Sequence, residues 1–263
     1  MIQHIMHNGK SGMHATKEYI SNISQNMVNA NTTGYKRIDS EFQTLISSSL
    51  DKDSYPNYSE NVATGNGVRV TGSYRDNTQG SLRQTGILSD FALEGPGFFR
   101  LLRADGTYAY TRSGEFSVDG WGRLTDESGN LLDIEFRDGY SYDNFSFSRE
   151  FMNSINNIGA PGDNGIDKEG HIRVNGEVIG KINAYTHIGS ADLLSVGDNL
   201  YIPKEDVNMV QSNSTYIHQG YIEMSNVNTA QEMTDLIAMQ RAYQLVGKGV
   251  TTADEMWSLV NNM

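Results

Sequence analysis

His4 and His7 are the residues whose types and spacing come nearest to a metal site in this sequence. They stand three positions apart, so on a helix both imidazoles could reach one ion, and histidine is a common ligand of zinc. No carboxylate and no third histidine lies within one turn on that helix face, and two ligands do not complete a site. The sequence therefore predicts two solvated helix residues here and no metal site.

The other patterns that could carry catalysis are incomplete. Gly65-Asn66-Gly67 and Gly95-Pro96-Gly97 lack the strand-then-helix context and the third glycine of a dinucleotide loop, and there is no Gly-x-x-x-x-Gly-Lys-Ser/Thr phosphate loop. There is no Gly-x-Ser-x-Gly elbow, and a chain without cysteine has neither a Cys–His nucleophile pair nor a disulfide. Nothing marks two of its acids for acid–base work. We predict no enzyme and no cofactor.

The charge of the chain excludes a further class of function. Its 263 residues carry a formal net charge of −12, whereas affinity for phosphate backbones requires Lys and Arg concentrated on one face. Residues 1–40 have a balance of +2 and residues 221–263 a balance of −3, so most of the negative charge falls between them. We expect no nucleic-acid partner and an acidic, water-facing middle region.

The sequence shows neither a secretory signal peptide nor a membrane-spanning segment. The N-terminus lacks the basic start, the apolar stretch and the small-residue cleavage site of a secretory signal, and nowhere do eighteen apolar residues follow one another. By these criteria the chain is cytosolic and soluble, unless it is exported on a signal that is never cleaved.

A helix is predicted at each end of the chain. The first runs from about Gln3 to about Asn31, beyond which Gly34 can take the left-handed conformation that closes a helix. The last begins near residues 225–228, with Asn228 as its N-cap, and continues to the end.

A β-rich region is predicted between these helices. Residues 67–70 read as an alternating strand, and from there to about residue 203 short apolar runs are separated by tight turns. Asp105-Gly106 and Asn175-Gly176 each stand between two such runs, which is the strongest local signal of a hairpin with a type I′ turn. The predicted fold class is α+β, with N- and C-terminal helices forming a coiled-coil layer and a mostly antiparallel β domain inserted between them.

Four segments follow from these signals: a helical assembly segment over residues 1–38, a helical and loop linker over 39–66, a β-rich body over 67–220 and a second helical assembly segment over 221–263. The linker is expected to be helical over 39–50, because Phe42, Leu45 and Ile46 would share one helix face, and to be a polar loop over 51–66. The stretch 140–157 is ambiguous between strand and helix.

Both terminal helices carry a narrow apolar seam. Its positions alternate in steps of three and four, which is the a/d pattern of helices that pack on helices. A single helix cannot hide such a stripe from water, so the seams indicate assembly; the alternative is that the two helices pair with each other as ordinary core. The seam positions are Met6, Gly9, Met13, Thr16, Ile20, Ile23, Met27 and Ala30 in the first helix, and Leu236, Met239, Tyr243, Val246, Val250, Ala253, Trp257 and Val260 in the last.

Four blocks of the sequence resemble a known family, the axial proteins of the bacterial flagellum, which comprise rod and hook subunits. In the first block an asparagine-rich helix ends at Thr33-Gly34-Tyr35-Lys36. The next two contain an apolar strand with a glycine turn and two aromatics, and the hairpin that follows it. The blocks cover residues 22–37, residues 90–99, residues 109–116 with 119–120 and 122–124, and residues 219–228 with 239–243, so they span most of the chain in the family's order.

This resemblance implies a structural subunit of the flagellar basal-body rod, in its distal part, with a proximal rod or hook-type subunit as the alternative. In such proteins both terminal helices form an inner coiled-coil layer around a channel, and the β domain lies outside. The implied partners are further copies in a helical polymer, other rod and hook proteins and the flagellar export apparatus, with no small-molecule substrate. The implied location is the basal body in the cell envelope, reached without a cleaved signal peptide. A secreted adhesin is the competing class.

The residues expected at the assembly interface are of two kinds. Residues of the helix seams would pack within and between subunits, and residues at the helix ends would fix the turn from the helix layer to the β layer. The first kind comprises Met6, Met13, Ile20, Ile23, Met27, Leu236, Met239, Gln240, Arg241, Tyr243, Val246, Val250, Trp257 and Val260, and the second comprises Asn26, Asn29, Asn31, Gly34, Tyr35, Asn226 and Asn228.

Overall fold

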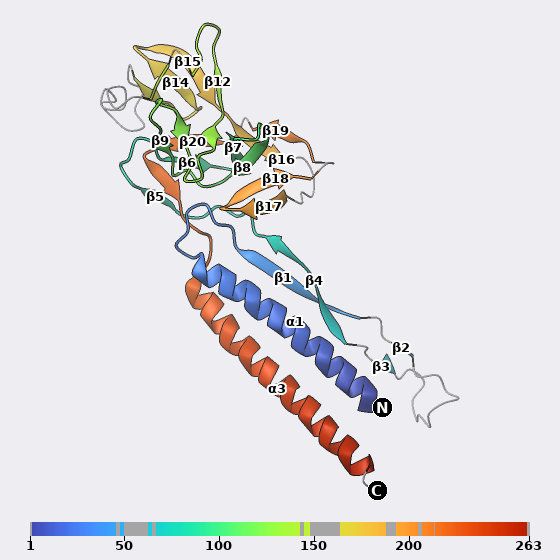
Figure 1. Cartoon of the computed structure of the whole chain (residues 1–263). Helices are drawn as coiled ribbons and strands as arrows, with labels where there is room; N and C mark the ends of the chain where they lie inside the picture. Colours follow the sequence, from blue (N-terminus) through green and yellow to red (C-terminus); the bar gives the residue numbers. More distant parts are fainter. Residues whose placement is uncertain are drawn as a thin grey trace. The chain divides into compact units, whose positions relative to one another are not determined.

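The computed structural model describes residues 2–45, 48–49, 63–64, 67–142, 145–147, 164–187, 193–204, 207–212 and 214–261. The chain forms two compact units (Figure 1). The helical unit comprises Met1–Ala30, Arg37–Asp76 and Val227–Met263, and the β unit comprises Asn31–Lys36 and Asn77–Asn226. Within the described ranges we find no helix with both the length and the hydropathy that crossing a membrane requires.

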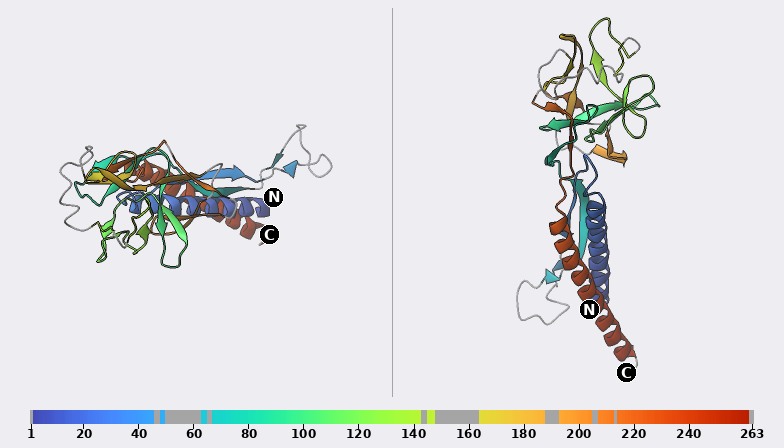
Figure 2. Two further views of the ribbon diagram at one scale, coloured as in Figure 1. Left: turned by 90° about the horizontal axis from the view of Figure 1, so that it is seen from above. Right: turned by 90° about the vertical axis from the view of Figure 1, so that its left-hand side faces the viewer.

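The helical unit pairs the two ends of the chain. Its elements are α1 (Ile2–Val28), β1 (Ile38–Thr44), β2 (Ser48–Ser49), β3 (Ala63–Thr64), β4 (Val68–Arg75) and α3 (Thr229–Asn261). The two helices run side by side and antiparallel, with Gly9 against Val250 and Gly12 against Val246 (Figures 1 and 2). A Cβ at Gly9 would lie 2.4 Å from Val250 Cγ2, so the helices approach closely there because Gly9 has no side chain.

Residues 38–44 form a strand, so the predicted helix over 39–50 is wrong where the structure describes it. β1 pairs with β4 in antiparallel register, for example Ile38 with Arg75. The Phe42 ring stacks on Tyr19 of α1 with a centroid distance of 5.2 Å. A helical period in a short apolar run does not exclude a strand, and here a partner strand some thirty residues away supplies the ladder. The predicted loop over 51–66 lies almost entirely outside the described residues.

The N-cap predicted for α3 is confirmed, whereas Gly34 is left-handed as predicted but does not close α1, because it lies six residues past Val28 and its N–H donates to Glu223 O. α1 ends at Val28, and Gly34 has a φ of 66°, in the left-handed region. At the start of α3, Asn228 Oδ1 accepts hydrogen bonds from the backbone N–H groups of Ala230 (3.1 Å) and Gln231 (3.3 Å), as an N-cap does. The Gln231 side chain donates to Asp235 instead of completing a capping box.

Replacing Asn228 with alanine is expected to destabilise α3 by about 1 kcal/mol, because two N–H groups lose their acceptor. Asn228→Asp keeps an acceptor at the same place and serves as the control. Thermal unfolding followed at 222 nm would measure the loss of helix. Equal melting curves for the alanine and aspartate variants would contradict the assigned cap.

The β unit is built from antiparallel strands. They are β5 (Leu82–Gln84), β6 (Phe91–Glu94), β7 (Phe98–Leu102), β8 (Tyr108–Thr111), β9 (Ser117–Val118), β10 (Leu124–Thr125), β11 (Leu131–Leu132), β12 (Ile134–Phe136), β13 (Gly165–Ile166), β14 (His171–Val174), β15 (Glu177–Ile182), β16 (Ala184–His187), β17 (Leu193–Gly197), β18 (Leu200–Pro203), β19 (Met209–Gln211), β20 (Tyr216–Gln219) and β21 (Tyr221–Glu223).

Among the described residues the largest sheet of the β unit has nine strands. Seven follow the order β17-β18-β8-β7-β11-β10-β9, while β16 pairs with β7 and β19 with β16. A second sheet has the order β12-β15-β14-β13. Two further ladders, β20 with β6 and β21 with β5, join strands more than 120 residues apart in sequence. The last two strands of the β unit therefore pair with its first two strands.

The two hairpins predicted from their turns are both present, but their turns differ. Asn175 and Gly176 have φ of 50° and 81°, as a type I′ turn between β14 and β15 requires. Between β7 and β8, Gly106 has a φ of 79° while Asp105 keeps a negative φ, so the type I′ prediction is wrong there. Asp105 Oδ1 instead accepts from the Thr107 N–H at 2.9 Å and stabilises a longer loop.

The core of the β unit gathers aliphatic and aromatic side chains from both larger sheets. Phe99 and Phe116 meet edge to face at 5.6 Å, and Phe147 is fully buried among them. Phe147 belongs to the stretch 140–157, whose sequence is ambiguous; residues 140–142 and 145–147 of it are described and the rest are not. The other core members include Phe91, Leu93, Leu101, Leu124, Leu132, Ile172, Ile179 and Ile182.

The boundaries of the two units differ from the predicted segments. The prediction places β4 at the start of the β-rich body, but β4 contacts β1 and α1, so it belongs to the helical unit. The β unit resumes at Asn77 and includes the short segment 31–36. A boundary drawn from local composition cannot place a strand whose partners lie elsewhere in the sequence.

Candidate assembly interface

An apolar groove lies along the paired helices of the helical unit. It has a volume of about 500 Å³ and is lined by Met6, His7, Lys10 and Met13 of α1 and by Val250 of α3. Met6, Met13 and Val250 are half-buried seam residues, whereas His7 and Lys10 are exposed. The groove therefore combines apolar walls with a basic margin.

The pairing of α1 with α3 covers the predicted seam only in part. Thr16, Ile23 and Ala253 are buried, so the alternative reading, in which the helices pair with each other, holds for part of each seam. The remaining seam side chains keep exposed surface. Tyr243 and Trp257 are exposed, and the side chain of Val260 lies outside the described residues. The half-buried members of the seams are Met6, Met13, Ile20, Met27, Leu236, Met239, Val246 and Val250.

Asn26 joins three elements of the helical unit. Its side chain exchanges two hydrogen bonds of 2.9 Å with the backbone of Ile38 and donates to Glu232 Oε2 at 3.2 Å. Arg37 Nε donates to the other oxygen of Glu232 at 2.7 Å. Partial burial opposes the charge of Arg37, but its bond to Glu232 and the nearby Asp39 outweigh this and raise the pKa of the guanidinium. Asn26 therefore acts inside the chain, where it ties α1 to β1 and α3.

The other predicted junction residues have varied surroundings. Asn29 donates to Gln25 O, Asn226 donates to Thr78 O at 3.1 Å, and Tyr35 is buried in the β unit. Asn31 is exposed, as are Gln240 and Arg241 on α3. The assembly role of these residues stays a prediction.

α3 has a second apolar stripe, which the a/d steps did not reveal. The residues of this stripe follow one another at spacings of eight, eleven and three positions. Each spacing differs from a whole number of helical turns by less than about a quarter turn, so all of the residues lie on one side of the helix. A search of α3 for a second apolar phase would have found it. We call it the outer stripe; it consists of Ile237, Leu245, Met256 and Leu259, which are 54%, 69%, 43% and 69% exposed.

A buried ion cluster in the β unit was also missed from sequence. The Glu223 carboxylate accepts from Lys36 Nζ at 2.7 Å, from Arg112 Nε and from the Gly80 N–H at 2.9 Å. The charged side chains are only 1–3% exposed. These three charged residues, Lys36, Arg112 and Glu223, are called the ion cluster below.

The ion cluster also binds backbone oxygens. Lys36 Nζ donates to Thr78 O at 2.7 Å, and Arg112 donates to the carbonyls of Leu93, Gly95 and Gly97. The Gly-Pro-Gly turn noted in the sequence thus supplies acceptors for a buried guanidinium. The cluster ties segment 31–36 to the turn and to β21.

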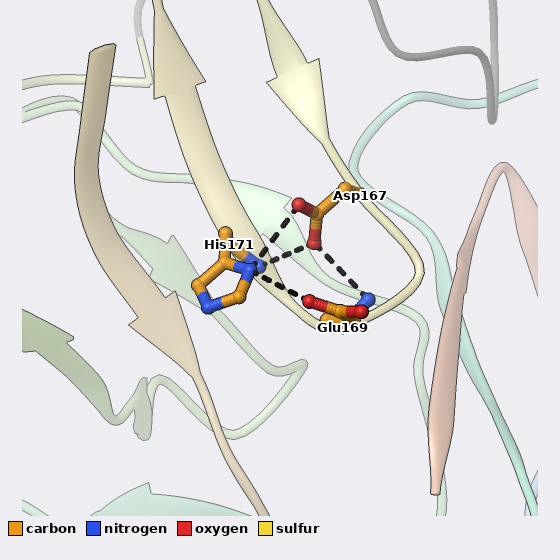
Figure 3. A group of neighbouring side chains, drawn as sticks. All are labelled: Asp167, Glu169 and His171. Atoms are coloured by element: carbon orange, nitrogen blue, oxygen red, sulfur yellow. Dashed lines mark hydrogen bonds and ion pairs between the residues drawn. The ribbon is translucent and has the colours of Figure 1, made fainter.

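One group of three potential metal ligands occurs among the described residues: Asp167, Glu169 and His171 (Figure 3). His171 Nδ1 lies 3.2 Å from Asp167 Oδ2 and 3.5 Å from Glu169 Oε2. Asp167 Oδ1 accepts from the N–H groups of Glu169 (3.0 Å) and His171 (2.8 Å), and Arg173 approaches Oδ2 to 3.4 Å. A guanidinium this close disfavours a cation.

The same loop occurs twice more without histidine. Asp119 Oδ1 accepts from the Arg123 N–H and its Oδ2 from Arg123 Nε, both at 2.8 Å. Asp126 does the same with the N–H and Nδ2 of Asn130, at 2.7 and 2.8 Å. His171 holds the position of Arg123 and Asn130, so we interpret it as the donor that closes an Asp-x-x-Gly loop.

Comparison with known proteins identifies the family. The family model described as flagellar hook protein FlgE/F/G D1 domain matches residues 92–174, and that described as flagellar basal body rod FlgEFG protein C-terminal matches residues 218–263. The flagellar basal-body rod protein FlgG of Borreliella burgdorferi is 33% identical over 96% of both chains, and that of Agrobacterium fabrum 33% over 95%. The flagellar hook-basal body complex protein FlhP of Bacillus subtilis is 29% identical over 94%.

These relatives are structural proteins of the basal body, and no catalytic family is indicated. The proximal rod or hook alternative is not favoured, because the curated FlgG proteins match along nearly the whole chain. The chain therefore belongs to the family of structural rod and hook subunits of the bacterial flagellum, in its FlgG-type, distal rod branch.

Proposed function

We propose that this chain polymerises through its terminal helices into the hollow, helical shaft of the flagellar rod, which transmits motor torque to the hook. The observation that carries the proposal is the apolar groove of the helix pair, whose seam residues stay half-buried in the single chain. Covering such surface is favourable, and helices with a/d seams cover it by packing on further helices. A coiled-coil layer built from several copies would bury it.

Membership of the rod and hook family supports further parts of this proposal. The partners would be copies of the chain and other rod and hook proteins, since the relatives are named as basal-body and hook-basal body components. We extend the proposal to delivery by the flagellar export apparatus. Cells that lack this apparatus should then retain the whole chain in the cytoplasm, as fractionation and immunoblotting would show.

Deletion of residues 1–30 is expected to abolish polymerisation and to leave the β unit folded. The deletion removes no residue of the β unit but removes α1 and with it one wall of the groove. Sedimentation and electron microscopy would report assembly, and thermal unfolding followed by near-UV circular dichroism would report the β unit. Loss of cooperative melting would instead place α1 in a core shared by the whole monomer.

Neighbouring positions on α1 offer a matched pair of point variants. Met13→Glu puts a charge into the groove and should stop assembly, while His14→Glu puts the same charge on an exposed position and should not. Both variants should keep the helix content of the parent chain. Equal assembly by the two would remove the groove from the proposed interface.

A further inference from the structure

The helical unit is rich in methionine. Eight of the 11 methionines of the chain lie in its terminal segments, four in residues 1–30 and four in residues 227–263. The chain has no cysteine, so no thiol competes for a two-electron oxidant and the thioethers are its most readily oxidised groups. Oxidation of this chain therefore acts mainly on the unit that carries the groove.

Two of these methionines form the apolar part of the groove wall that α1 contributes. Met6 and Met13 stand seven residues apart, which is about two helical turns, so they lie on one side of α1. The other α1 residues that line the groove are the exposed, polar His7 and Lys10. The apolar character of this wall therefore depends on two thioethers. We call Met6 and Met13 the groove methionines.

The groove has room for a small oxidant. Its volume is about 500 Å³, whereas one molecule of water occupies about 30 Å³ in the liquid and hydrogen peroxide is only slightly larger. Both groove methionines are half-buried, so they keep accessible surface in the single chain. Peroxide can therefore reach both sulfur atoms without unfolding the helix pair.

The closest approach of α1 to α3 does not involve the groove methionines. It occurs where Gly9 faces Val250 and Gly12 faces Val246. In the part of the chain that the structure describes, no buried seam residue is a methionine. A polar group added at the groove methionines therefore changes the groove and leaves the closest contacts of the helix pair in place.

We infer that the groove methionines are a site of reversible oxidation, and that their conversion to sulfoxides by hydrogen peroxide stops assembly of the chain. The inference rests on the proposed function and adds a form of regulation to the same groove. In each reaction a sulfur lone pair attacks one peroxide oxygen, and the O–O bond breaks as an S=O bond forms. The sulfur loses two electrons, and the rest of the peroxide leaves as one molecule of water.

A sulfoxide opposes the burial that assembly requires. The S=O group is strongly polar and accepts hydrogen bonds, so covering it without a donor costs free energy. A helix that packs through an apolar seam offers no donor on its contacting side, because its backbone N–H groups are bonded within the helix. Methionine sulfoxide reductases return both sulfoxide epimers to methionine, so the effect is reversible.

Peroxide treatment of the full-length chain before assembly tests the inference. The treatment should raise the protein concentration at which polymers sediment by about tenfold or more. Incubation with reductases for both epimers and dithiothreitol should restore the original value. The same treatment should change that concentration by less than about twofold in the Met6→Leu/Met13→Leu variant, because leucine keeps the wall apolar and is not oxidised.

Met233→Leu is the matched control. It removes a thioether that is 53% exposed on α3 but keeps the groove methionines, so this variant should stay as sensitive to peroxide as the parent. Circular dichroism at 222 nm should show the same helix content before and after oxidation. A loss of helix would place the effect in the fold of the helical unit and would overturn the inference.

Two further results would overturn it: oxidised parent chain that assembles like the untreated chain, or a double leucine variant that stays as sensitive as the parent. In both cases, assembly of the untreated parent leaves the proposed function standing. If the untreated parent forms no polymer, the proposed function fails and the inference fails with it.

Mass spectrometry of the parent chain gives a second measurement that needs no variant. Partially oxidised chains are allowed to assemble, and the sulfoxide content of each methionine is compared between pellet and supernatant. Met13, which trypsin isolates in residues 11–17, should show a sulfoxide content lower in the pellet by about fivefold or more. Met209, half-buried in the β unit, should show equal contents. Equal contents for Met13 as well would overturn the inference.

Discussion

Glu223→Gln is expected to lower the free energy of unfolding of the β unit by about 3–5 kcal/mol, the usual effect of breaking a buried ion pair. Two cations that are only 3% exposed, Lys36 and Arg112, would lose the carboxylate that compensates both. For a unit of this size the melting temperature should fall by roughly 10 °C. Urea and thermal unfolding followed by near-UV circular dichroism would measure the change.

An exposed ion pair of the same unit provides the control. Arg137 and Glu177 stand 3.6 Å apart with side chains 65% and 60% exposed, so Glu177→Gln should cost less than about 1 kcal/mol. Adding Lys36→Met to Glu223→Gln should recover part of the loss, because one uncompensated charge is then replaced by an apolar side chain. Similar effects of the two glutamine variants would show that the ion cluster does not hold the β unit together.

Gly34→Ala is expected to destabilise the β unit by about 2–4 kcal/mol, through backbone conformation and crowding together. Gly34 has a φ of 66°, which alanine resists. A Cβ there would also lie 2.4 Å from Ser113 N and 2.6 Å from the carbonyl carbon of Arg112. Relieving these contacts would move the Gly34 N–H away from Glu223 O, to which it now donates at 2.8 Å.

Gly106→Ala separates the two causes. Gly106 has a φ of 79°, but a Cβ added there would meet no atom within 4 Å, so only the backbone term applies and the cost should be about 1 kcal/mol. The difference in unfolding free energy between the two variants measures the close approach at Gly34. Equal values would mean that residues 112–113 move aside freely.

Local signals in the sequence were enough to predict the helices and some of the turns. The cap at Asn228 and the hairpin at Asn175-Gly176 each depend on residues close together in the chain, and each is confirmed. The strand β1 was missed because its partner β4 is remote, and a short apolar run fits a helix or a strand equally well.

Contacts between distant parts of the chain explain what else was missed. Lys36, Arg112 and Glu223 all lie in the blocks that carry the family resemblance, yet nothing in any one block shows that they meet. The groove residues Met6, Met13 and Val250 were predicted because the a/d steps mark the helix side that packs. The a/d steps describe only one side of a helix. They therefore missed the outer stripe, which lies on another side of α3.

The ion cluster also has a temporal consequence for a chain made from its N-terminus. Lys36 and Glu223 are 187 residues apart. Lys36, in the first segment of the β unit, therefore cannot pair with Glu223 until late in translation. Contacts of such long sequence separation form late in folding. The β unit therefore cannot complete its buried ion pairs until most of the chain has been synthesised.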